Sequence, residues 1–210
     1  MGCDGKTHAR FPALNLVVRG VVMIRFFLLL VIAIISSASR ADSEIMPRPY
    51  IVTQSGLFES YYFKMIPQVF HFEGDEIVID SEAWGKAYRL NIDGTETELW
   101  SVSGWHSNKV YLTGENAKNL VRLGNWSRGQ KPKKEDLAVA FYEQGNLLRS
   151  YSTADLIKNP NSVKQSISHY QWQLSENLER NNKYFYIETV EKIIYKFDVS
   201  SGEIVDVKYP

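Results

Sequence analysis

Pairs of short segments that alternate apolar with polar residues recur along this chain, and each pair flanks a short turn. The clearest pair covers residues 87–92 and 95–100 and is joined by Asp93-Gly94, a dipeptide that accepts the positive φ angles of a tight hairpin turn. Two further pairs share this plan: 137–142 with 146–151 around Glu143-Gln144-Gly145, and 183–189 with 192–199 around Val190-Glu191. Alternation with a period of two indicates half-buried strands. The sequence therefore predicts a mainly β fold of antiparallel hairpins or meanders.

Less regular segments extend this pattern. Residues 76–79 alternate as a strand that leads to a turn near Trp84-Gly85, and residues 203–207 alternate as a last strand. Residues 109–112 and 120–123 predict another hairpin, although Thr113 could instead cap a helix of one or two turns. The strands could be arranged as a sandwich, a barrel or a small propeller.

One short helix is expected over residues 152–158. Ser152 is a suitable N-cap residue, and Asp155 follows three positions later, as in a capping box. Asn159-Pro160 ends the segment, because the residue before a proline avoids the helical region. The expected fold therefore contains one or two short helices among many strands.

The N-terminal 41 residues have the pattern of a secretory signal peptide. Arg25 precedes ten consecutive apolar residues, 26–35, and small residues follow, with Ser39 and Ala41 at positions compatible with cleavage. A membrane-spanning helix needs about 20 mostly apolar residues, so we expect a cleaved leader over 1–41 and an exported protein, periplasmic or secreted. Retention of residues 24–38 as a membrane anchor is the alternative. Met23 could be the true translation start.

Residues 42–210 are expected to form a single β-rich domain whose composition differs from that of the whole chain. They contain 19 basic and 23 acidic residues, a net charge of −4, and they lack Cys3, the only cysteine. An acidic domain is a poor partner for nucleic acid, which requires clustered basic charge. Without a thiol, thiol catalysis and cysteine-ligated metals are excluded, and no cofactor is expected.

Catalytic motifs are absent from the sequence. It contains no Gly-x-Ser-x-Gly and no Ser-x-x-Lys motif, and its histidines lack the spacing of a zinc site. The acidic residues within 73–82 do not follow the order of a calcium-binding EF-hand, so we predict no metal site. The catalytic candidates are His169 and His106, and His169 lies among Ser166, Ser168, Tyr170 and Trp172.

Tryptophans provide the candidates for ligand binding. Exposed indole rings can stack on sugar rings, much as aromatic side chains stack on other flat faces. The alternative is that the indoles fill the core of a β domain that has no disulfide. The candidate ligand-binding residues are Trp84, Trp105, Trp126, Tyr170 and Trp172.

Several sequence blocks resemble those of an uncharacterised group of exported bacterial β-rich proteins. They are Ser60-Tyr61-Tyr62-Phe63-Lys64-Met65-Ile66-Pro67, Leu120-Val121-Arg122-Leu123-Gly124-Asn125-Trp126, Leu137-Ala138-Val139-Ala140-Phe141-Tyr142, Leu148-Arg149-Ser150-Tyr151 with Asp155-Leu156, and Ser166-Ile167-Ser168-His169-Tyr170-Gln171-Trp172. The resemblance implies export and β-rich character, and no activity. The hairpins also resemble propeller blades, but Thr113-Gly114-Glu115-Asn116 lacks the Asp-Gly of a blade turn. At about 40–45 residues per blade, the domain could supply about four blades at most, the lower limit for closure.

These observations favour a non-catalytic binding or structural module in the cell envelope or outside the cell. Its expected partner is a protein, an envelope component or a glycan, and a membrane contact would be made only through a retained N-terminal segment. Two alternatives remain: a membrane-tethered structural protein, and a periplasmic hydrolase that uses His169 or His106.

Overall fold

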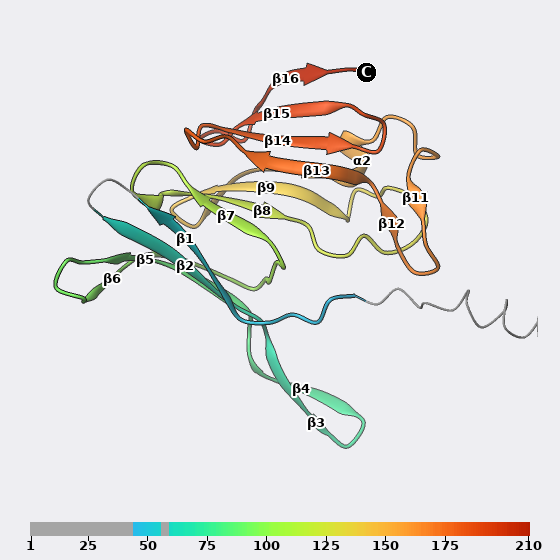
Figure 1. Cartoon of the computed structure of the whole chain (residues 1–210). Coiled ribbons are helices and arrows are strands. Elements are labelled where there is room, and N and C mark those ends of the chain that lie inside the picture. Colours follow the sequence, from blue (N-terminus) through green and yellow to red (C-terminus); the bar gives the residue numbers. More distant parts are fainter. Residues whose placement is uncertain (1–43, 56–58) are drawn as a thin grey trace, which may run out of the picture. The chain divides into compact units, whose positions relative to one another are not determined.

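The computed structural model describes residues 44–55 and 59–210. The predicted leader, its cleavage site, the alternative anchor and the alternative start at Met23 lie outside the described residues. The described part is mainly β with antiparallel sheets, as predicted (Figure 1). Within this part, no helix is both long and apolar enough to cross a membrane.

Three antiparallel sheets, each of four strands, follow one another along the chain. The first sheet has the order β1-β2-β5-β6 and comprises β1 (Tyr50–Ser55), β2 (Ser60–Ile66), β5 (Trp84–Leu90) and β6 (Glu96–Ser103). The middle sheet comprises β7 (Val110–Thr113), β8 (Asn119–Leu123), β9 (Leu137–Glu143) and β10 (Asn146–Ser152). The last sheet comprises β13 (Gln173–Leu178), β14 (Tyr184–Thr189), β15 (Ile194–Asp198) and β16 (Ile204–Lys208). The described strands form open meanders and no closed barrel.

Smaller elements connect these sheets. Two hairpins stand apart from them: β3 (Val69–Glu73) with β4 (Glu76–Ser81), and β11 (Lys164–Gln165) with β12 (Tyr170–Gln171). A short 3-10 helix, η1 (Glu115–Ala117), lies inside the β7–β8 connection, so this segment is the predicted hairpin with a turn of helix at its tip. The helix α2 (Thr153–Leu156) begins at Ser152 with the expected capping box to Asp155, although it ends earlier than predicted.

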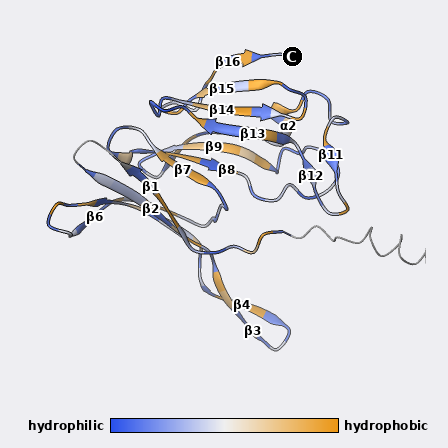
Figure 2. Ribbon diagram, in the orientation of Figure 1, coloured by the Kyte–Doolittle hydropathy of each residue, from blue (hydrophilic) through white to orange (hydrophobic). Residues whose placement is uncertain are grey.

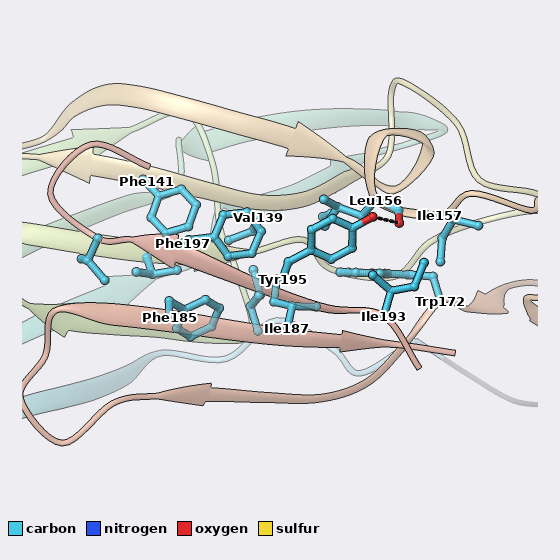
Figure 3. Packing of buried hydrophobic residues seen from close by; sticks show 14 of the residues in the cluster. Val139, Phe141, Leu156, Ile157, Trp172, Phe185, Ile187, Ile193, Tyr195 and Phe197 are labelled. Atoms are coloured by element: carbon cyan, nitrogen blue, oxygen red, sulfur yellow. Dashed lines mark hydrogen bonds between the residues drawn. The ribbon is translucent and has the colours of Figure 1, made fainter. Parts of the chain in front are cut away.

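The two inner strands of the middle sheet, β8 and β9, are buried on both faces. Neighbouring residues of β8 belong to different cores: Leu120 packs in a cluster with the first sheet, and Val121 in a cluster with the last sheet. In β9, Val139 and Phe141 reach the core shared with Phe185 and the rest of the last sheet (Figure 3). A strand covered on both faces has a continuous apolar sequence, which explains why residues 137–142 contain no charged side chain.

Turn positions follow the chemistry read from the sequence. Gly94 has a φ of 83°, and Gln144 and Gly145 have φ values of 48° and 84°, as expected for tight hairpin turns. Gly124, directly after β8, is required for a different reason, because a β-carbon there would clash with the backbone carbonyl of Leu137.

The expected turn near Trp84-Gly85 is wrong. Both residues lie inside β5, where Gly85 pairs with Met65 of β2 and with Val102 of β6. Glycine is needed at this position because a β-carbon would clash with the ring of Phe63, which packs over the backbone. The turn of this segment lies at Gly74, with a φ of 64°, between β3 and β4.

Candidate functional site

Two distant segments are joined by backbone hydrogen bonds at one end of the middle sheet. The amide of Tyr170 donates to the carbonyl of Ser127 over 3.1 Å, and the amide of Gly129 donates to the carbonyl of Ser168 over 3.1 Å. An antiparallel bridge pairs Arg128 with His169 between them. The loop after β8 is thereby fixed beside β12, which brings Trp126 next to His169.

Trp126 and His169 form one wall of a shallow pocket of about 290 Å³. Their ring centroids are 3.9 Å apart, with an angle of 34° between the ring planes, and both side chains are half-buried. Trp172 also lines the pocket, and Gln171, Gln173 and Glu176 contribute polar groups. We call this hollow the Trp126 pocket.

Tyr170 and Trp172 anchor the pocket to the core. Tyr170 is 2% exposed and Trp172 is 7% exposed, and both belong to the core between the middle and last sheets. The Tyr170 hydroxyl donates to Oδ2 of Asp136 over 2.6 Å and lies 2.7 Å from Oγ1 of Thr153. Burial, together with the Asp136 carboxylate, raises the pKa of Tyr170 to about 12. Its hydroxyl is therefore neutral and holds the pocket wall in place.

Glu176 lies on the polar side of the pocket and is the shared hydrogen-bond acceptor for three neighbouring side chains. This carboxylate accepts hydrogen bonds from Nζ of Lys109, from Nε2 of Gln173 and, over 3.4 Å, from the hydroxyl of Tyr111. The ammonium of Lys109 balances its charge. The pocket consequently combines an aromatic wall with amide groups and no unbalanced charge from Glu176, an arrangement suited to a polar, uncharged ligand.

His106 and Trp105 lie in a different hollow, of about 420 Å³, beside the β3–β4 hairpin. The Nε2 atom of His106 lies 3.2 Å from the carbonyl oxygen of Arg48, and its ring meets Tyr50 edge-on. Burial lowers the pKa of His106, and the nearby Arg122 lowers it further, whereas the Arg48 carbonyl opposes this shift. None of these contacts is with a carboxylate, so within the described chain His106 has no acidic partner for acid–base catalysis.

Trp84 lies on the first sheet and belongs to neither hollow. The ammonium of Lys86 is 5.7 Å from its ring centroid. The structure therefore brings Trp126, His169, Tyr170 and Trp172 to one site and leaves Trp84, Trp105 and His106 elsewhere. Trp100, at 8% exposed, is a core residue whose Nε1 donates to the carbonyl of Ala117 over 3.0 Å.

Sequence reasoning did not identify Gln171, Gln173 and Glu176 as pocket residues. A signal was present in the alternation of Gln171, Trp172 and Gln173, which places two amides on the face opposite a buried indole. In the described ranges, 44–55 and 59–210, no group of three or more His, Cys, Asp or Glu residues could hold a metal ion.

Comparison of the chain with protein-family models and with curated proteins finds no match to either. The resemblance to exported β-rich bacterial proteins therefore stays a prediction, and the site is interpreted from its own geometry.

Proposed function

We propose that the protein is an exported, non-catalytic binding module that holds a carbohydrate in the Trp126 pocket. The observation that carries this proposal is the packing of Trp126 against His169 beside the amides of Gln171 and Gln173. A sugar ring has one or two apolar faces of C–H groups and an edge of hydroxyls. The aromatic wall suits the apolar face. The amides suit the hydroxyl edge, because their oxygens can accept and each Nε2, which already donates one hydrogen bond within the protein, has a second hydrogen to donate.

The charge balance of the pocket supports a neutral ligand. Glu176 is already engaged by Lys109 and Gln173, so an incoming charged group would have to compete with these contacts. The fixed geometry of the pocket also supports binding, because the walls are tied to buried Tyr170 and Trp172. Preorganised walls reduce the entropy that is lost when a ligand is held.

The carboxylate content of the pocket supports binding without hydrolysis. Glycoside hydrolysis normally uses two carboxyl groups about 5–9.5 Å apart, on either side of the scissile bond. Among the described residues that line the pocket, Glu176 is the only carboxylate, so the pocket lacks the second carboxyl group that this reaction normally uses.

A titration with soluble oligosaccharides tests the proposal. We would titrate the purified protein with glucose-based and N-acetylglucosamine-based tetrasaccharides in an isothermal calorimeter, and compare Trp126→Ala with Trp84→Ala as a matched control. We expect binding by the wild type and by Trp84→Ala, and a loss of at least about tenfold in affinity for Trp126→Ala. Absence of binding to either sugar series, or equal affinities for the two variants, would refute the proposal.

A further inference from the structure

The β3–β4 hairpin, here called the arm, projects from the end of the first sheet (Figure 1). One of its faces is wholly apolar, because cross-strand register pairs Phe70 with Ile79 and Phe72 with Ile77. These four side chains are 51–66% exposed, and the two phenylalanine rings meet edge-on with centroids 5.8 Å apart. More than half of each side chain is therefore open to solvent. Contiguous apolar surface of this kind marks an interaction site.

Acidic residues gather at the tip of the arm, where Glu73 pairs with Glu76 across the turn, and the ribbon is coloured as hydrophilic there (Figure 2). Residues 69–83 contain five acidic residues and no lysine or arginine. His71 lies between two of the carboxylates, with Nδ1 2.8 Å from Asp80 and Nε2 3.3 Å from Glu73. Among the described residues, no lysine or arginine forms an ion pair with any of the five. In the described part of the chain, the arm thus joins a largely exposed apolar face to carboxylates that no lysine or arginine pairs with.

The apolar surface continues from the arm onto the body of the domain. Phe70 and Ile77 also line the 420 Å³ hollow, where they face Pro47, Ala83 and Trp105. A partner that covers the arm can therefore extend into this hollow. The added area matters, because stable protein interfaces bury about 800 Å² on each partner, more than four exposed side chains offer.

We infer that the arm docks a partner protein whose contact surface is an apolar strip bordered by lysine or arginine. The negative charge of the arm favours such a protein over a lipid surface or a second copy of the arm. An anionic lipid surface repels five carboxylates, and two copies of the arm packed face to face would bring ten carboxylates together, with like-charge repulsion. A basic border instead pairs with the carboxylates while the strip covers Phe72 and Ile77, and an isolated two-stranded hairpin gains stability when its apolar face is covered.

A labelled peptide that alternates valine with lysine is the probe for this surface. Its binding to the full protein is followed by fluorescence anisotropy, beside a valine–glutamate peptide and a serine–lysine peptide. We expect the valine–lysine peptide to bind at least about tenfold more tightly than either control, and to weaken as salt rises. A double variant, Phe72→Ser with Ile77→Ser, should remove binding. A second, Asp75→Asn with Glu76→Gln, should weaken it, and circular dichroism checks that both remain folded.

Separate experiments test whether a lipid surface or a second copy of the chain covers the arm instead. Flotation with zwitterionic and anionic vesicles tests a lipid surface, and sedimentation of the protein alone tests a second copy. The inference is overturned if the valine–lysine peptide does not bind, if all three peptides bind equally, or if the Phe72/Ile77 variant retains wild-type affinity. It is also overturned if vesicles bind more tightly than the peptide, or if the protein is a dimer that this variant converts to a monomer. Trp126→Ala should leave peptide binding intact, which separates this inference from the proposed carbohydrate site.

Discussion

Phenylalanine-to-alanine substitutions at two positions measure how strongly the middle sheet is held between its neighbours. Phe141 is fully buried in β9, and its ring centroid lies 5.3 Å from that of Phe197 and 6.5 Å from that of Phe185. Removing a buried phenylalanine ring typically costs about 3–5 kcal/mol. Because each kcal/mol moves the melting temperature of a domain of this size by about 2–4 °C, Phe141→Ala should lower it by about 6–20 °C.

Phe72→Ala is the matched control, since Phe72 is 66% exposed on the arm. An exposed substitution changes stability by less than about 0.5 kcal/mol, so its melting temperature should move by at most about 2 °C. Thermal unfolding followed by circular dichroism measures both variants under the same conditions. Equal shifts for the two, or a shift of less than about 2 °C for Phe141→Ala, would refute the stacked arrangement of the sheets.

Two other predictions concern Tyr195 and His106. The Tyr195 hydroxyl donates to the carbonyl of Leu156 over 2.7 Å inside the core (Figure 3), so Tyr195→Phe should cost about 1–3 kcal/mol by leaving that carbonyl unsatisfied; an unchanged midpoint of urea unfolding would contradict this. Burial lowers the pKa of His106 in the folded protein below its unfolded value of about 6.5. As the pH falls through about 6.5, the unfolded state therefore binds more protons than the folded state does. The free energy of unfolding, which is highest above that pH, decreases as a result. His106→Gln should therefore reduce the loss of stability between about pH 7.5 and pH 5.5, and an identical loss in both proteins would contradict the assignment.

The features that the sequence predicted correctly depend on interactions between residues close together in the chain. The hairpin around Asp93-Gly94 and the cap formed by Ser152 and Asp155 depend on residues a few positions apart, and both are present as expected. The turn predicted near Trp84-Gly85 is wrong because glycine has two roles in a β protein: it allows tight turns, and inside a strand it leaves room for a neighbouring side chain. At Gly85 it admits the Phe63 ring from the neighbouring strand, and this contact depends on register between strands rather than on local sequence.

The aromatic residues of the candidate site could be predicted from the sequence, but its polar residues and its assembly could not. Trp126 and His169 are both candidates from the sequence, yet their ring contact depends on the backbone pairing of residues 127–129 with 168–170. No local sequence pattern predicts that pairing. The exposed face of the arm was hidden for a related reason, because alternation over residues 76–79 indicates a strand with one apolar face and does not say whether that face is covered.

The most direct test of the proposed carbohydrate site follows the five indole N–H signals by nuclear magnetic resonance during an oligosaccharide titration. Trp126 forms the pocket wall and Trp84 lies away from it, so each indole reports on its own location. We predict that the Trp126 signal shifts saturably, that Trp172 responds as part of the same pocket, and that Trp84 remains unchanged. A titration that leaves all five signals in place, or that moves Trp84 and not Trp126, would contradict binding in the Trp126 pocket.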